Sequence, residues 1–292
     1  MRKAIFPLIW LLTVMLGSAK ITVSSLNPIL TDMITQIGGD KVEVIQVMKP
    51  GVDVHKFQPS SASLAKIQES QLIFAMGKGL ETYLGGIQET LREGQQIIDV
   101  GRSIPSQKVD ADQVYTCCPA HSKGSVDPHW WHSVKNAERA AKTIGKALEK
   151  ADPANKSFYK NNSRALQKTY RNLHNWVKSE VSQIPKEDRV VVTAHAAFAY
   201  FCKEYGFRAA YVKGLSNESK ISTKQFAETV QSLRDNNIKA VFPEKLSNPK
   251  MLNEIAKETG AKTGHPLHAD CIKTSYKEFI EHNVHSIVNA LK

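Results

Sequence analysis

Short apolar runs alternate with helical stripes of apolar residues along the first half of the chain. Runs rich in β-branched residues predict strands at 20–24, 42–48, 71–76 and 96–100. Apolar residues spaced three or four apart from Ile29 to Ile37 predict a helix, which ends at Gly38-Gly39. This alternation is typical of parallel sheets flanked by helices, so we expect an α/β fold.

The same alternation resumes in the second half. It predicts strands at 189–193, 209–212 and 239–242, and helices at 196–205, 223–235, 248–259 and 275–291. A further short strand is expected just before His265-Pro266. The second half is therefore expected to form a lobe built like the first.

One long helix is predicted between the two halves, from residue 153 to residue 184. Asp152 and Pro153 are suited to its first turn, and Pro185 forbids its continuation. At 1.5 Å per residue it would be on the order of 45 Å long, so we interpret it as a rigid strut. The predicted parts are a first lobe at 20–151, a linker helix at 152–185 and a second lobe at 186–292.

The N-terminus has the features of a secretory signal, predicted at 1–19. Arg2 and Lys3 precede an apolar run at 4–16, and small residues lead to a predicted cleavage between Ala19 and Lys20. The run is shorter than the about 20 residues of a spanning helix, so a retained anchor is disfavoured. No lipid-acceptor cysteine stands at the cleavage point. We expect a soluble protein outside the cytoplasm, most simply in a periplasm.

Charge and cysteine content narrow the function classes. The formal net charge is +11, but no arginine-rich block or basic run interleaved with aromatics indicates nucleic-acid binding. The four cysteines show no disulfide framework and no C-x-x-C zinc motif; they are Cys117, Cys118, Cys202 and Cys271. A Cys202–Cys271 disulfide stays open, and Cys117 and Cys118, near His121, are either free thiols or additional metal donors.

Four candidate metal ligands recur in loops that follow predicted strands: His55, His129, His195 and Asp270. Ligands of open α/β sheets bind beyond the carboxyl ends of the strands, where such loops converge. Asp127 and Pro128 are expected to begin a helix at His129. Three imidazoles and one carboxylate suit a tetrahedral zinc ion.

Four segments that contain these residues resemble the ordered signatures of one family. They are PGVDVHKFQPS (50–60), DPHWW (127–131), VVVTAHAAFAYFCKEYGF (190–207) and VFPEKLSNPKMLNEIAKETGAKTGHPLHAD (241–270). The chain resembles the cluster A-I solute-binding proteins of ABC importers for zinc, manganese and iron, the ZnuA-like and TroA-like group. The resemblance covers nearly all of the chain beyond the predicted signal.

The resemblance implies two pseudo-symmetric lobes joined by one long helix, with the metal buried between them. His55 and His129 would be ligands from the first lobe, and His195 and Asp270 from the second. It also implies a binding protein rather than an enzyme, expected to be a monomer. Its partners would be a membrane permease and a cytoplasmic ATPase.

Zinc is the predicted metal, with manganese and iron as alternatives. Manganese-type members of the family often have glutamate at the position of His195, so the histidine favours zinc. The long histidine-rich loop of many zinc-specific members has no counterpart at 115–126, which holds only His121. Extra zinc capture by that segment is therefore not expected.

Three nearby side chains leave the ligand set open. His268 replaces the family's usual tyrosine and is either a supporting residue or a substitute ligand. His132 could approach the same ion as His129, although we expect it to be exposed. Trp130 and Trp131 are expected to pack around the site. Glu244 either orients a histidine or forms a structural salt bridge.

Two other functions use the same residue types. A secreted zinc hydrolase is disfavoured because the sequence has no H-E-x-x-H motif and no evident general base. An adhesin that holds metal only for stability would unfold broadly on metal removal, whereas a carrier would stay folded.

Overall fold

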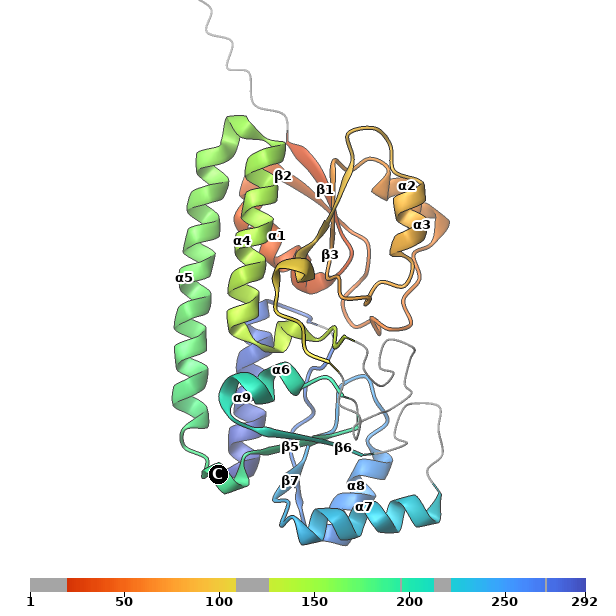
Figure 1. The fold of residues 1–292 in the computed structure, drawn as a ribbon, viewed down its shortest axis with the longest axis vertical. Coiled ribbons are helices and arrows are strands. Elements are labelled where there is room, and N and C mark those ends of the chain that lie inside the picture. The colour runs from red at the N-terminus through yellow and green to blue at the C-terminus, as the bar shows by residue number, and fades with distance from the viewer. Residues whose placement is uncertain (1–19, 109–125, 195, 213–221, 271) are drawn as a thin grey trace, which may run out of the picture.

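The chain forms two α/β lobes with long helices running beside both (Figure 1). The computed structural model describes residues 20–108, 126–194, 196–212, 222–270 and 272–292. The predicted fold class, two parallel-sheet lobes with a long linking helix, is confirmed. No helix in the described ranges combines the length and the hydropathy that crossing a membrane requires.

The first lobe contains a four-stranded parallel sheet in the order β2-β1-β3-β4. Its strands are β1 (Ile21–Ser25), β2 (Val42–Gln46), β3 (Leu72–Ala75) and β4 (Gln96–Asp99). Its helices are α1 (Pro28–Gly38), α2 (Ser61–Ile67) and α3 (Leu84–Glu89). All four predicted strands are present. Helices α2 and α3 were not predicted; they have seven and six residues and only one buried residue each.

The second lobe repeats the parallel arrangement with shorter strands. Its strand pairs are β5 (Val190–Thr193) with β6 (Arg208–Tyr211), and β7 (Ala240–Val241) with β8 (Lys262–Thr263). A hydrogen bond from the Phe242 N–H to the Val192 carbonyl, 2.8 Å long, connects the two pairs. The helices are α6 (Ala199–Tyr205), α7 (Thr223–Asp235), α8 (Lys250–Thr259) and α9 (Tyr276–Leu291). All correspond to predicted elements.

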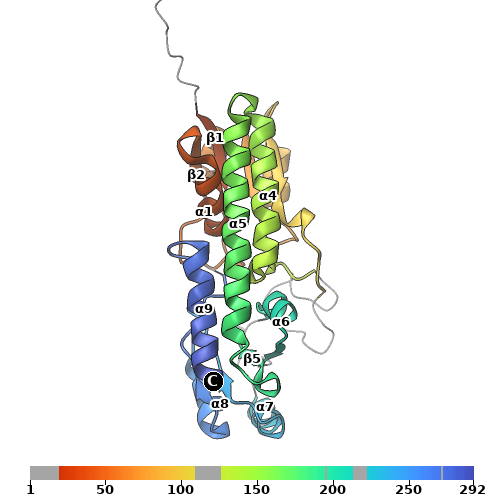
Figure 2. The ribbon, with the colours of Figure 1, turned by 90° about the vertical axis from the view of Figure 1, so that its left-hand side faces the viewer.

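Two long antiparallel helices, α4 (Val134–Ala151) and α5 (Lys156–Val181), line one side of the molecule (Figure 2). The predicted long helix is confirmed as α5, although its first residues form a 3-10 turn at Pro153–Asn155. The Asp152 side chain accepts a hydrogen bond from the Asn155 N–H in that turn. The boundaries 20–151, 152–185 and 186–292 remain a proposed division of the chain.

A shared apolar core connects the lobes. One cluster of buried side chains contains Leu30 of α1, Leu173 of α5 and Ile280 of α9. Contacts of α5 extend to α1 and α4 in the first lobe and to α6 and α9 in the second. The Asp32 carboxylate in α1 also accepts the Tyr276 N–H at the start of α9, at 3.0 Å. Because separating the lobes would expose this core, their spacing is fixed by packing as well as by the helix.

Candidate metal centre

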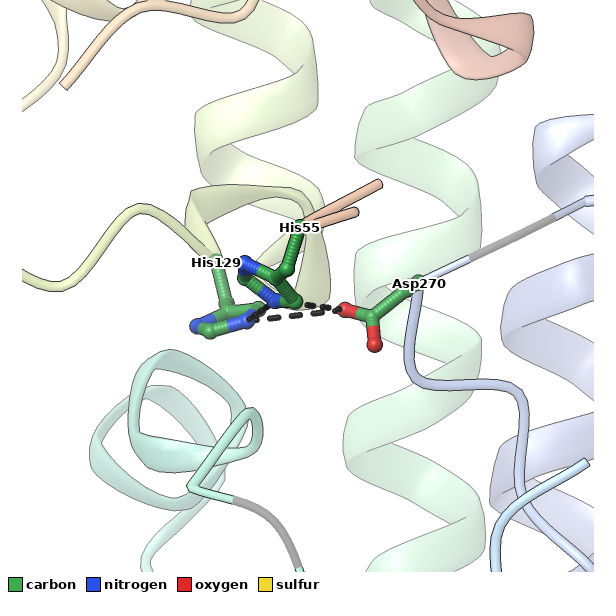
Figure 3. Close-up of side chains that lie close together, drawn as sticks. All are labelled: His55, His129 and Asp270. Atoms are coloured by element: carbon green, nitrogen blue, oxygen red, sulfur yellow. Dashed lines mark hydrogen bonds and ion pairs between the residues drawn. The ribbon is translucent and has the colours of Figure 1, made fainter. Parts of the chain in front are cut away.

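Three of the four predicted ligands meet between the lobes (Figure 3). His55 lies in the loop after β2, His129 directly precedes the 3-10 helix η5 (Trp130–His132), and Asp270 follows β8. One nitrogen or oxygen atom of each residue lies within 4.8 Å of the others. Residues 55, 129 and 270 thus converge although more than 70 positions separate each from the next along the chain.

The separations of these atoms match the edge of a metal-centred tetrahedron. The Nε2 atoms of His55 and His129 are 3.2 Å apart. The Asp270 Oδ1 atom lies 3.7 Å from the His55 Nε2 and 3.5 Å from the His129 Nε2. Two donor atoms about 2.0–2.2 Å from a zinc ion, at tetrahedral angles, are about 3.3–3.6 Å apart. The three donors therefore fit around one ion with little adjustment.

The Asp127 carboxylate fixes the ring of His129. Its Oδ1 atom lies 2.7 Å from the His129 Nδ1 and 2.9 Å from the backbone nitrogen of the same residue. Because a carboxylate only accepts hydrogen bonds, the ring proton is on Nδ1, which leaves a lone pair on Nε2. That lone pair faces the other two donors. The expected helix beginning at His129 is only η5, and α4 begins at Val134.

Asp53 holds the backbone of the loop that carries His55. The Asp53 Oδ1 atom accepts the His55 N–H at 2.9 Å, and the Lys56 N–H donates to the Asp53 carbonyl at 3.3 Å. Gly51, with φ +82°, allows the turn that begins this loop. The His55 side chain is 10% exposed, whereas that of His129 is fully buried. The site is thus nearly closed on the His129 side and more open at His55.

His132 is buried rather than exposed, which corrects the expectation from the sequence. Its Nε2 atom lies 2.8 Å from the Ala269 carbonyl, and its ring packs 4.3 Å, centroid to centroid, from Phe198. Burial lowers the pKa of His132 to about 3, and the nearby His129 acts in the same direction. The prediction failed because it did not anticipate the packing of the second lobe on this segment, where Phe198 and Phe279 lie against the His132 ring.

The neighbouring tryptophans are buried, as expected. The Trp131 Nε1–H donates to the Ala269 carbonyl at 2.9 Å, and the Trp130 Nε1–H donates to the Met76 carbonyl at 3.0 Å. The contact of Trp131 with Ala269 was not predicted. The only feature of the sequence that points to this contact is the segment WWH, whose three rings carry N–H donors and which directly follows the proposed ligand His129.

Several other sequence candidates have less defined roles. His195 lies outside the described residues, as do His121, Cys117, Cys118 and Cys271, while Cys202 is a buried free thiol. His268 is half-buried, its ring centroid is 4.6 Å from that of His282, and burial lowers its pKa to about 4. Glu244 is buried beyond β7. Among the described residues, the ligand cluster does not include His268 or His132.

The fold and the site define a class of protein: a two-lobed α/β binding protein with a metal site between its lobes. The chain belongs to the family described as "ZnuA: Zinc-uptake complex component A periplasmic", whose model matches residues 23–290. The family resemblance recognised in the sequence is thereby confirmed. Proteins of this family are metal-binding components of ABC transporters that act outside the cytoplasm, and they are not enzymes.

Characterised relatives carry different metals in their names. The manganese-binding lipoprotein MntA of Bacillus subtilis is 30% identical over 284 residues, covering 94% of this chain and 90% of that protein. The iron-binding protein YfeA of Yersinia pestis is 30% identical over 256 residues, covering 87% and 78%. Family membership alone therefore does not select among these metals.

Solved structures agree in fold over nearly the whole chain. The Mn-bound periplasmic metal-binding protein from Candidatus Liberibacter asiaticus has a TM-score of 0.82 and 27% identity, and covers 94% of this chain and 100% of that chain. The periplasmic zinc-binding protein TroA from Treponema pallidum has a TM-score of 0.81 and 25% identity, with coverages of 94% and 99%.

Proposed function

We propose that this protein captures Zn²⁺ outside the cytoplasm and delivers it to the membrane permease of an ABC importer, which a cytoplasmic ATPase drives. The observation that carries the proposal is the convergence of the His55 Nε2, His129 Nε2 and Asp270 Oδ1 atoms between the lobes. His195 is proposed as the fourth ligand. Two ligands would then come from each lobe, so the bound metal would hold the lobes together.

The donor set supports zinc over manganese and iron. Three imidazole nitrogens and one carboxylate oxygen form a nitrogen-rich tetrahedral set, which zinc accepts readily. For such donors, zinc binds more tightly than divalent manganese or iron in the general order of stabilities. The Asp127 contact, which leaves the His129 Nε2 lone pair ready for a metal, is the usual support of zinc-bound histidine.

Carriage fits the site better than hydrolysis. A catalytic zinc site has three protein ligands and an open position for water, whereas four protein ligands close a tetrahedral site. The His129 side chain is fully buried and that of Asp270 is 11% exposed, so these two ligands are largely shielded from solvent.

The proposed location and assembly follow from the family and the N-terminal sequence. We propose a periplasmic, monomeric protein that is soluble after cleavage between Ala19 and Lys20. Mass spectrometry of the exported protein should give an N-terminus at Lys20. An intact signal sequence or a lipid-modified N-terminus would contradict this part of the proposal.

The metal is tested by elemental analysis of protein purified without added metal, followed by competition among Zn²⁺, Mn²⁺ and Fe²⁺. We expect one zinc per chain, retained against excess manganese or iron. Substituting one of four ligands removes roughly a quarter of the about 10–16 kcal/mol typical of a tetrahedral zinc site. His129→Ala and His195→Ala should each lose about 3 kcal/mol of binding free energy and remain folded.

Three results would contradict the proposal. Preferential retention of manganese or iron would overturn the choice of zinc while leaving a metal carrier. Wild-type affinity in His195→Ala would remove residue 195 from the ligand set. Broad unfolding on metal removal would favour a metal-stabilised protein over a carrier.

A further inference from the structure

A single carbonyl group links the two halves of the metal centre. The Ala269 carbonyl, in the second lobe, accepts the Trp131 Nε1–H at 2.9 Å and contacts the His132 Nε2 at 2.8 Å. Because a carbonyl only accepts, this ring nitrogen of His132 carries the proton. Both donors come from η5 of the first lobe, directly after His129. All three residues are at most 5% exposed.

This carbonyl belongs to the peptide group that precedes Asp270. The peptide group is planar, so holding its oxygen also holds the nitrogen of residue 270. What remains free is the rotation about the backbone and side-chain bonds of Asp270 itself. A carbonyl has two lone pairs, and Trp131 and His132 supply two rigid ring donors to them. The orientation of this plane is therefore set by the opposite lobe.

The contact is reciprocal. The Tyr276 hydroxyl, at the start of α9, donates to the Trp131 carbonyl at 2.6 Å. The His132 ring packs against Phe198 of the second lobe at 4.3 Å and against Phe279 of α9 at 5.4 Å, both measured between ring centroids. Second-lobe groups thus hold Trp131 and His132 on several sides. Breaking one of these hydrogen bonds without another partner leaves a buried polar group unpaired, which lowers the stability of the folded protein.

We propose that Trp131 and His132 are positioning residues for Asp270: by holding the Ala269 carbonyl, they set where the carboxylate of the second lobe meets the histidines of the first. The inference rests on the proposed function, because it assigns Asp270 to the metal. It predicts that the affinity for zinc depends on two ring N–H groups that do not touch the ion.

The first test compares two replacements of His132. His132→Phe keeps an aromatic ring between Phe198 and Phe279 but removes the N–H donor, whereas His132→Gln offers an amide N–H near the same place. Measured by competition with a chromophoric chelator, Zn²⁺ affinity should fall about 10–100-fold in His132→Phe, the usual loss for a supporting residue. His132→Gln should recover to within about threefold of the original protein. Equal losses in both variants would overturn the proposal.

A matched pair of tryptophan variants separates positioning from packing. Trp131→Phe and Trp130→Phe make the same change at adjacent, fully buried positions, and each loses an N–H bond to a backbone carbonyl. Only the bond of Trp131 reaches the second lobe. We expect a loss of zinc affinity of about tenfold or more in Trp131→Phe and of less than about threefold in Trp130→Phe. The reverse order would contradict the proposal.

A double-mutant cycle distinguishes positioning from general destabilisation. If His132 acts through Asp270, His132→Phe should cause no further loss of zinc affinity in an Asp270→Ala background. A loss in that background as large as in the original protein would mean that His132 acts elsewhere, and would overturn the inference. His129→Ala tests the site separately: unchanged zinc affinity in that variant would overturn the proposed function itself.

Discussion

Two loops of the first lobe share the pattern D-x-H but hold their histidines differently. Asp53 precedes His55 and Asp127 precedes His129 by two residues, and in both loops the carboxylate accepts the histidine N–H at 2.9 Å. Only Asp127 also reaches the ring, 2.7 Å from the His129 Nδ1. The local sequence therefore sets the backbone turn in both loops, and the packing around the second fixes the ring as well.

Burial accounts for this difference. Residues after His129 insert between the lobes, and the ring of Trp131 lies against that of His129 with centroids 5.1 Å apart. His55 instead lies in a loop that begins at Gly51 and keeps 10% of its side chain exposed. The ring of His129 is therefore more tightly enclosed than that of His55.

The largest expected effect, that of Asp127→Ala, distinguishes the two aspartates. Asp127→Ala and Asp53→Ala both lose the hydrogen bond to a histidine N–H, but only the first loses the contact with a ring. Zinc affinity should fall about 10–100-fold in Asp127→Ala and less than about threefold in Asp53→Ala. Titration with a competing chelator measures both. Losses of similar size would show that the turn, rather than the ring contact, supports the ligand.

Most strands and helices could be predicted because the spacing of apolar residues that indicates each element lies within that short segment of the sequence. The range of α7 was predicted as observed, and the strands of the three sheets lie within a few residues of the predicted positions. The helices α2 and α3 were missed because such short elements bury too little apolar surface to show a period. A helix was expected to begin at His129, but only the 3-10 helix η5 lies there, and α4 was not predicted as a separate helix.

The candidate site was predictable for a different reason. His55 and Asp270 lie in loops that follow β2 and β8, and the carboxyl ends of parallel strands bring such loops together, whereas His129 precedes η5. The hydrogen bonds of Trp131 and His132 to Ala269 were not predictable, because they join residues 138 and 137 positions apart across the two lobes. Nothing in the local pattern of either segment specifies such a contact.

Acid should lower the unfolding free energy of the protein through protonation of His132. Burial and the nearby His129 lower the pKa of His132 to about 3 in the folded protein, while Asp270 and Asp127 act in the opposite direction. The neutral ring therefore stabilises the fold above the unfolded pKa of about 6.5, and this contribution is lost as the pH falls from there toward 3. The loss approaches about 1.4 kcal/mol per pH unit for this one group.

The variant His132→Gln cannot take up this proton and provides the comparison. Urea unfolding of metal-free protein should show a steeper loss of unfolding free energy between pH 6 and pH 4 in the original protein than in His132→Gln. If the unfolding free energies of the two proteins depend on pH in the same way, folding does not lower the pKa of His132.

The smallest expected effect concerns the freedom of the His55 loop. Gly51 has φ +82° and Gly94 has φ +85°, and a methyl group added at either would meet no atom within 4 Å. Alanine should therefore cost only backbone strain, about 1 kcal/mol of unfolding free energy at both positions. Gly94 precedes β4, at the edge of the sheet opposite the carboxyl ends where the ligand loops lie. If the strain in Gly51→Ala shifts His55, zinc affinity should fall up to about fivefold, while Gly94→Ala leaves it unchanged. Equal zinc affinities in the two variants, at equal losses of stability, would mean that the loop absorbs the strain without moving the ring of His55.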